Sequence, residues 1–261
     1  MKLHRLFAVL LRHLYATRRS LDRLTDIFYW PTIDIAIWGL TSAYFQKLTG
    51  SDGGFFVAII SGLILWIILY MASNSIALTI LQDLWDRNLM NVLVSPLSWT
   101  EWMLGNILLS LVRVALSFTF TMLLTLVLYK VSLFASMALL IPHIALLIMT
   151  SWWIAFIIIG SILRFGTRIQ TLAWALVAVI SPFSAIYYPL SSLPQFAQNI
   201  AHLIPSSYIF ESAREVITTG HYDMVKLGTC LALNLIYLAL SLVYLKTSIN
   251  TAQKKGLASL Y

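Results

Sequence analysis

The sequence contains few charged residues and a single cysteine. Of its 261 residues, 10% are Asp, Glu, Lys or Arg, whereas 60% are hydrophobic. Soluble domains carry about 25% charged residues, so this balance excludes a water-soluble globular domain and indicates an integral membrane protein. Cys230 lies inside an apolar run, so one chain can form neither a disulfide framework nor a cysteine metal cluster. We interpret it as a small buried hydrophobic residue.

Common catalytic motifs are also absent from the sequence. It has no G-x-x-x-x-G-K-[ST] loop for the phosphates of ATP, and we expect this chain to bind no cofactor itself. H-E-x-x-H, G-x-S-x-G and clustered acids that would hold Mg²⁺ are absent as well. Two alternatives remain open: an integral membrane enzyme acting on lipids or peptides, and a channel or scaffold subunit, because re-entrant loops also line pores.

Six apolar runs are long enough for transmembrane helices, which need about 20 residues each. The sequence therefore predicts an all-α integral membrane protein with one transmembrane domain over residues 1–261. An even number of spans places both termini on the same side of the membrane. The expected spans are 27–46, 55–79, 104–129, 134–163, 171–190 and 225–245.

The basic residues indicate which side holds the termini. Lys and Arg are concentrated in the N-terminal segment, in the loops after the second and fourth spans and in the tail 246–261. By the positive-inside tendency, we expect both termini in the cytoplasm of a multi-pass inner-membrane protein. The net charge of +7 is dispersed among these orientation determinants, so it does not indicate nucleic-acid binding.

The segment 1–26 has the pattern of a basic amphipathic helix. We expect it to lie on the inner leaflet in contact with membrane lipids, either as an anchor for the first span or as a gate or lipid-recognition element. It is not a signal peptide, because no short apolar core and no small-residue cleavage site follow. One face carries Leu3, Leu6, Phe7, Leu10, Leu11 and Leu14, and the other carries Arg5, Arg12 and Arg19.

The apolar pattern breaks over residues 82–95, between the second and third spans. Residues 82–94 contain neither Gly nor Pro, so they can continue or restart a helix, with Asp83, Asp86 and Arg87 expected in water. An ordered, charged projection of this kind suits docking of another protein. A capped hairpin that contacts nothing fits the same pattern.

The restart of the third span has a clear local signature. Pro96 disfavours the helical conformation at Ser95 and ends the preceding helix. Ser98 followed three residues later by Glu101 is a capping-box pattern. We therefore expect two helical ends around a tight break.

Prolines divide the segment between the fifth and sixth spans. Pro189, Pro194 and Pro205 leave pieces too short to cross the bilayer, and Phe196 belongs to an apolar stripe between them. Non-helical backbone at membrane depth is tolerated only when it is buried in protein or beside water. We expect the extracytoplasmic residues 191–218 to form a re-entrant hairpin beside a translocation path, or an interfacial cap without a transport role.

Ionisable residues inside spans are common markers of functional sites. Asp34 and Arg113 each lie about two helical turns from the cytoplasmic end of their span, so an ion pair between them is possible, with snorkelling of Arg113 as the alternative. His143 is expected to be a hydrogen-bonded packing residue. Glu211 and Arg214 are expected to lie on a solvated helix face.

Two stretches resemble one known family. The runs QDLWDRNLMNVLVSPLSWTEWMLGNIL and RFGTRIQTLAWALVAVISPFSAIYYPLSSLPQFAQNIAHLIPSSYIFESAR are similar to the permease subunits of type-2 ABC exporters. That resemblance implies a coupling helix in the loop after the second span, which sits in a groove of an ATPase subunit. Asp86 and Arg87 would be its charged contacts, although many relatives carry Glu in that turn. The coupling residues would be Leu84, Trp85, Asp86, Arg87, Leu89 and Leu93.

The resemblance also implies a function. The chain would be a permease that forms a homodimer, or a heterodimer with a related permease, with the translocation pathway at the subunit interface. ATP and Mg²⁺ would bind to a separate cytoplasmic ABC ATPase, and transport would be export. The re-entrant region with Pro189, Pro194, Phe196 and Pro205 would lie on the exit side. A lipid-linked glycan, a drug-like amphiphile and a peptide all fit an apolar interface as cargo.

Overall fold

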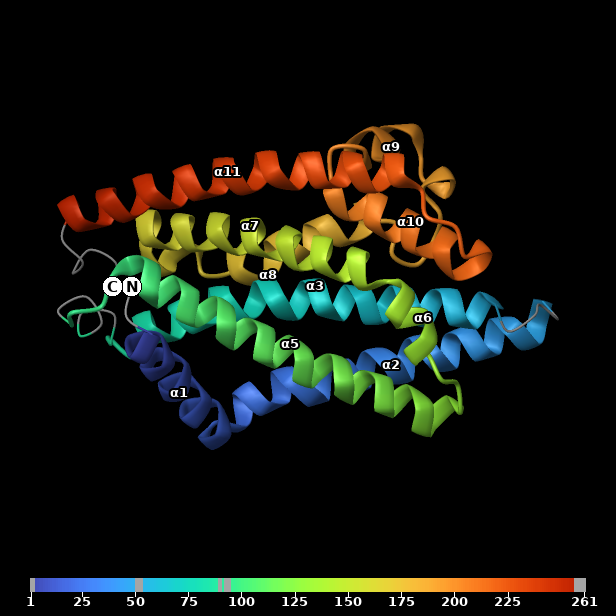
Figure 1. The fold of residues 1–261 in the computed structure, drawn as a ribbon, viewed down its shortest axis with the longest axis horizontal. Coiled ribbons are helices and arrows are strands. Elements are labelled where there is room, and N and C mark those ends of the chain that lie inside the picture. Colours follow the sequence, from blue (N-terminus) through green and yellow to red (C-terminus); the bar gives the residue numbers. More distant parts are fainter. Residues whose placement is uncertain (1–2, 50–53, 89–90, 92–94, 256–261) are drawn as a thin grey trace.

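The computed structural model describes residues 3–49, 54–88, 91 and 95–255, and these residues contain helices and no strands. The all-α prediction is confirmed. Figure 1 shows the long helices running side by side along one axis, with shorter helices at one end. The elements are α1 (Leu3–Arg19), α2 (Leu21–Thr49), α3 (Gly54–Trp85), α5 (Trp99–Tyr129), α6 (Phe134–Leu139), α7 (Ile141–Phe165), η1 (Gly166–Ile169), α8 (Leu172–Ile180), η2 (Ser181–Phe183), η3 (Leu190–Ser192), α9 (Gln195–Ala201), α10 (Pro205–Thr219) and α11 (Met224–Lys255).

In the part of the chain that the structure describes, four helices, α3, α5, α7 and α11, are long and apolar enough to cross a membrane. The 29-residue helix α2 runs beside them in Figure 1 and packs on α3 and α5. It is less apolar because it carries Arg23, Asp26 and Asp34. Several helices extend beyond their predicted spans: α3 continues to Trp85, and α5 begins at Trp99.

Prolines shorten or divide two of the predicted spans. The helix expected over 171–190 is shorter in the structure, because α8 ends at Ile180 and the turn η2 follows with Pro182. Proline has no amide hydrogen to continue a helix and clashes with the carbonyl four residues back. The run expected as one helix over 134–163 is divided into α6 and α7, with Pro142 in the first turn of α7.

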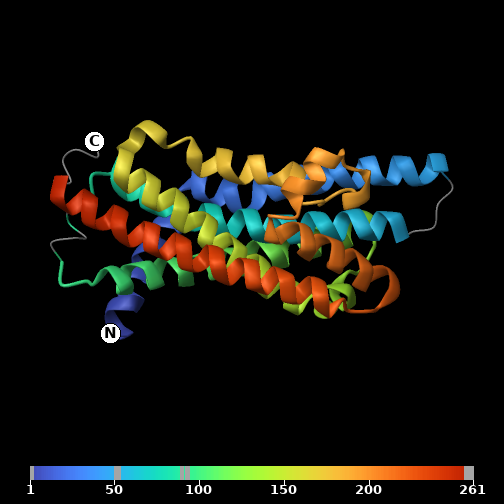
Figure 2. The ribbon, with the colours of Figure 1, turned by 90° about the horizontal axis from the view of Figure 1, so that it is seen from above.

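The core lies along α3 and α7, whose apolar segments are mostly buried, whereas those of α5 and α11 are largely exposed. Turned by 90°, Figure 2 agrees with Figure 1 in placing α2 and α11 on opposite sides of α3. Small polar residues let the helices approach α3 closely. The Ser110 hydroxyl donates to the Ala72 carbonyl at 3.0 Å, and the Ser151 hydroxyl donates to the Leu69 carbonyl at 2.9 Å.

The beginning of α1 and the end of α11 lie at the same end of the bundle (Figure 1). The end of α3 and the beginning of α5 are at that end as well, whereas α9 and α10 are at the other (Figure 1). We refer to these as the terminal end and the outer end of the bundle. Polar side chains gather at both.

Candidate functional site

Helix α1 lies across the terminal end and packs on α5 and α2. Its inner face is a stripe of the buried side chains of Leu6, Val9, His13 and Thr17. Gly105 of α5 makes the close approach possible, since a Cβ at that position would lie 2.7 Å from Cγ1 of Val9. The helix is therefore seated on the bundle through one narrow face.

The opposite face of α1 is apolar and exposed. Its large side chains are between 49% and 69% exposed, a pattern typical of a helix that lies in a membrane interface. Among the other leucines expected on this face, Leu6 is buried against the bundle, and Leu10 and Leu14 are half-buried. The exposed face consists of Leu3, Phe7, Leu11 and Tyr15.

An ion pair joins the middle of α1 to the end of α3. Nη2 of Arg12 lies 2.7 Å and 2.8 Å from the two carboxylate oxygens of Asp83, and the side-chain Nδ2 of Asn88 donates to the same carboxylate at 3.3 Å. Asp83 is only 5% exposed, so the expectation that it lies in water is wrong. The reason is that the side chains of Arg12 and Asn88 both bind this carboxylate, which the local sequence of α3 does not indicate.

His13 lies beside this ion pair, with its ring nitrogen Nε2 3.1 Å from Nη2 of Arg12. Burial, together with the positive charges of Arg12, Arg23 and Arg113, lowers the pKa of His13 from 6.5 to about 3. The imidazole is therefore neutral at physiological pH. A protonated His13 would add a buried positive charge to a place that already holds several.

A second contact joins the beginning of α1 to the beginning of α5. Arg5 donates to the carbonyl of Pro96, and its Nη1 lies 3.7 Å from the carboxylate of Glu101. The predicted capping box is confirmed: the Glu101 amide donates to the Ser98 hydroxyl at 3.2 Å, and the Ser98 amide donates to the Glu101 carboxylate at 3.1 Å. Arg5 thus binds the group that also caps α5.

A third contact joins the end of α1 to Arg113 in the middle of the bundle. Arg113 is 6% exposed and donates to the Thr17 hydroxyl at 2.8 Å and to the Ser75 hydroxyl at 3.3 Å. Within the described part of the chain, no ion pair joins it to Asp34, so that predicted pair is not formed. Arg113 does not snorkel to the membrane interface either, because its guanidinium donates to hydroxyl groups of α1 and α3 inside the protein. We call these three contacts, through Arg5, Arg12 and Arg113, the α1 clamp.

Helix α3 ends in a Schellman motif directly beside the clamp. The Asn88 amide donates to the Asp83 carbonyl and the Arg87 amide donates to the Leu84 carbonyl, both at 2.9 Å, which is the hydrogen-bond pattern of that motif. Arg87 adopts the left-handed conformation with φ 52°. The chain therefore leaves α3 at residues 86–88, within the segment expected to continue or restart a helix. Asn91 is helical, and the Ser95 amide donates to the Asn91 carbonyl at 3.2 Å.

The predicted coupling residues differ in their accessibility. Trp85, Asp86 and Arg87 are exposed, and the Trp85 indole donates to the Gln170 side chain at 3.0 Å. Leu84 is fully buried, so its expected contact with a partner is wrong and its role is packing of α3. Two further predicted residues, Leu89 and Leu93, lie outside the described residues.

A cavity of about 350 Å³ separates α1 from the loop that follows α3. Its walls include the basic side chains Arg5 and Arg12 and the amide side chains Asn88 and Asn91, and Trp102 of α5 borders it. The terminal end thus presents a recess with a basic wall next to three exposed side chains. Among the described residues, no group of three or more His, Cys, Asp or Glu could hold a metal ion.

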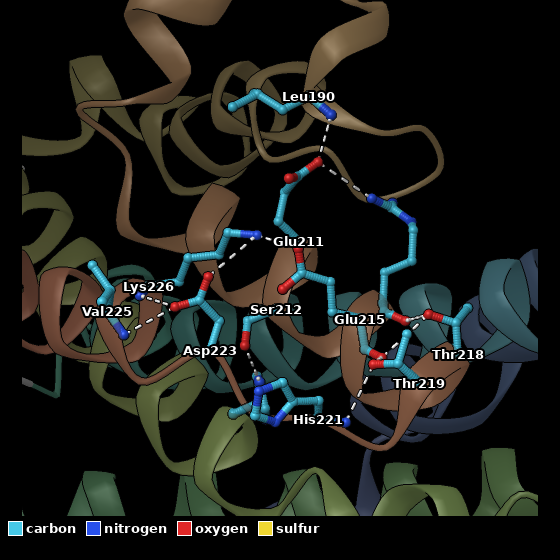
Figure 3. A network of polar contacts seen from close by, with 12 residues as sticks. Leu190, Glu211, Ser212, Glu215, Thr218, Thr219, His221, Asp223, Val225 and Lys226 are labelled. Atoms are coloured by element: carbon cyan, nitrogen blue, oxygen red, sulfur yellow. Dashed lines mark hydrogen bonds and ion pairs between the residues drawn. The ribbon is translucent and has the colours of Figure 1, made fainter.

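At the outer end, hydrogen bonds from α10 hold the irregular segment that follows α8 in place. Arg214 donates to the carbonyls of Ala185 at 2.8 Å and Tyr188 at 3.1 Å, and the Leu190 amide donates to the Glu211 carboxylate at 2.6 Å. Figure 3 shows the Glu211 contact with Leu190. Glu211 and Arg214, which were expected on a solvated helix face, instead bind the backbone of the segment after α8. Helical spacing alone does not reveal these partners.

The predicted proline-rich residues border this contact. Pro189 precedes the turn η3, Pro194 is the N-cap residue of α9, and Pro205 begins α10. Phe196 of α9 is 67% exposed. These short elements contain no helix long enough to cross a membrane, as the spacing of the prolines predicts.

Further polar contacts lie at the outer end. Asp223 accepts from the amides of Val225 and Lys226 at 2.9 Å and 3.1 Å, and Lys226 also contacts Glu215 (Figure 3). His143 is fully buried and lies 3.0 Å from the Ser212 hydroxyl. The interpretation of His143 as a hydrogen-bonded packing residue agrees with this contact.

Comparison with known proteins identifies the family. The family described as ABC-2 type transporter matches residues 13–218, from the middle of α1 to the end of α10. A search of curated proteins found no match to this chain. The matched region contains Asp83 and Arg113 of the clamp, the end of α3 and the Arg214 contact. The chain therefore belongs to the ABC-2 type transporter family and is a transmembrane permease component of an ABC transporter.

Proposed function

We propose that this chain is the permease subunit of an ATP-driven exporter and that a separate cytoplasmic ATPase docks at the terminal end. The α1 clamp carries this proposal. It joins the end of α3, the loop before α5 and the middle of the bundle to one helix, so a force on that loop would reach three helices together. The exposed Trp85, Asp86 and Arg87 supply an accessible surface beside it.

We propose that the chain crosses the inner membrane six times with both termini in the cytoplasm. The four apolar helices α3, α5, α7 and α11 would be joined by α2 and by the segment of α8 through Leu190. Support comes from the course of α2 and α8 beside the other helices (Figure 1) and from the basic residues at the terminal end. The Arg214 contact would hold the half-length α8 and its irregular continuation in a re-entrant arrangement at membrane depth.

A dimer supplies the second half of the pathway in this proposal, either as two copies or with a related permease. ATP and Mg²⁺ would bind to the partner ATPase. Closure of an ATPase pair would push the two terminal ends together and switch the dimer between inward-closed and outward-open states by rigid-body motion. A lipid-linked glycan, an amphiphile and a peptide are all compatible cargo classes.

Copurification tests this function directly. A tagged chain is expressed in its native host, extracted in a mild detergent, and its eluate is identified and assayed for ATP hydrolysis. We expect stoichiometric recovery of an ATPase subunit. A lone protein without ATPase activity would favour the alternatives of a membrane enzyme or a channel or scaffold subunit.

Charge reversal tests the docking surface within that experiment. Asp86→Arg combined with Arg87→Asp should reduce recovery of the ATPase by roughly tenfold, because like-charge contacts at a docking interface are strongly unfavourable. Lys47→Glu is the matched control, since Lys47 is exposed at the far end of α2. Equal ATPase recovery from the double variant and the control would show that docking takes place elsewhere.

A further inference from the structure

A second and larger groove lies at the terminal end, on the outside of the bundle. It is formed by the first turns of α5 and the last turns of α11, with Phe156 of α7 among its lining residues, and its volume is about 650 Å³. Most of its wall is apolar. The aliphatic lining includes Leu104, Ile107, Leu242 and Ile249.

The groove belongs to the part of the surface that faces hydrocarbon in a membrane. Among the four helices long enough to cross a membrane, α5 and α11 are the least buried within the protein. An apolar recess between two such helices is filled by lipid chains, because water gains too few polar partners there. Its position near the ends of both helices places it at the level where acyl chains meet headgroups.

One end of the groove is polar. Lys246, Asn250 and Gln253 line it, and their spacing puts them on one face of α11. Lys246 is exposed and forms no ion pair within the residues that the structure describes. Lys246 lies in the last turns of α11, which ends at Lys255, and a lysine near the membrane interface extends its ammonium group towards it, where lipid phosphates lie.

We propose that this groove binds an anionic phospholipid of the leaflet at the terminal end, with an acyl chain between α5 and α11 and the headgroup at Lys246. Charge complementarity selects this occupant: the polar end offers one cation and two amides and no acidic side chain. Trp99 lines the groove, and its edge-to-face partner Trp102 borders the cavity beneath α1. The lipid therefore lies against the same turn of α5 that Arg5 binds from the other side.

The proposal is independent of ATP coupling, because binding is measured on the purified permease alone. The protein is delipidated in detergent and incubated with phosphatidylglycerol or phosphatidylcholine of identical acyl chains, and retained lipid is counted by native mass spectrometry. We expect phosphatidylglycerol to be retained over phosphatidylcholine by roughly fivefold, the effect of one lysine near an anionic headgroup.

Three variants make the test specific. Lys246→Ala should abolish the preference for phosphatidylglycerol, whereas Lys254→Ala should keep it, because Lys254 is an exposed lysine of the same helix that does not line the groove. Ile107→Trp should fill the groove and reduce retention of both lipids. Correct folding of each variant is checked by its elution volume and thermal unfolding.

Three results would overturn the proposal. They are equal retention of both lipids by the unaltered protein, an equal loss in the Lys246→Ala and Lys254→Ala variants, and full retention by a folded Ile107→Trp variant. Crosslinking of two copies through Asn250→Cys in native membranes would show that a second copy covers the groove, which also excludes a lipid there.

Discussion

The Arg12 guanidinium of α1 binds both carboxylate oxygens of Asp83, 71 positions away at the end of α3. This pair lies between the contacts of Arg5 and Arg113, so α1 is held at its beginning, middle and end. The amphipathic helix is therefore part of the bundle on one face and available to lipid on the other. Several consequences can be measured.

Loss of the Arg12 contact should loosen α1. In the Arg12→Ala variant, Asp83 remains buried without its cation, and we expect a loss of about 1–2 kcal/mol in the free energy of unfolding. This expected loss lies between the contributions typical of exposed and of buried ion pairs, because the Arg12 side chain is partly solvated. Thermal unfolding in detergent measures it. Arg18→Ala, an exposed neighbour on α1, should have almost no effect, and equal losses in both variants would contradict a specific pair.

Substitution of Arg113 should release the end of α1, whereas substitution of Asp34 should not. Arg113→Met leaves the Thr17 hydroxyl without its donor, so the link between the end of α1 and the middle of α5 is lost. Limited proteolysis at residues 19–21 should then be faster, because a released helix junction is more accessible. Asp34→Asn serves as the comparison. Accelerated cleavage in that variant would indicate that Asp34 supports Arg113 after all.

A side chain at Gly105 should push α1 away from α5. The Cβ of Gly105→Ala would lie within 3 Å of two atoms of Val9, and overpacking of this kind costs about 1–3 kcal/mol. The free energy of unfolding should fall accordingly. Gly228→Ala is the matched control in α11, because no atom lies near its Cβ and alanine favours a helix over glycine. A neutral Gly105→Ala would contradict the close approach.

Acidification should weaken the attachment of α1 through His13. The pKa of His13 is about 3 in the folded protein and about 6.5 when exposed. The unfolded state therefore binds more protons between these values, so the contribution of neutral His13 is complete above pH 6.5 and declines as the pH falls towards 3. Thermal unfolding at pH 7.5 and pH 5 measures the decline, which should be smaller in His13→Gln. His221→Gln, at an exposed histidine, should behave as the unaltered protein does.

Removal of Arg214 should free the segment after α8. The Arg214→Ala variant leaves the carbonyls of Ala185 and Tyr188 without their donor, which costs about 1–3 kcal/mol for buried groups. We expect a lower unfolding temperature and faster hydrogen exchange over residues 185–190. Thr218→Ala, on an exposed part of the same helix, is the control. Unchanged exchange in the Arg214→Ala variant would show that other contacts hold the segment.

Local sequence signals predicted local structure well. The capping box at Ser98 and Glu101 is present as expected, because its hydrogen bonds join residues three positions apart. Pro194 and Pro205 lie at the starts of α9 and α10, and this too was predictable because a proline restricts only its own backbone and that of its neighbours. The predicted pair of Asp34 and Arg113 failed, because it required the relative rotation of two helices and the position of α1, which no local pattern contains.

The sequence by itself determined that the chain is helical, apolar and suited to a membrane, since composition and hydrophobic run length depend on each segment alone. It also indicated α1 and the break after α3. Only the tertiary structure decided that Asp83 and Leu84 are buried, that Arg113 donates to the Thr17 hydroxyl, and that Arg214 holds residues 185–190. These contacts join residues up to 96 positions apart in the sequence. A buried charged group needs a hydrogen-bond partner, and the packing of the helices decides which polar atom lies close enough to be that partner.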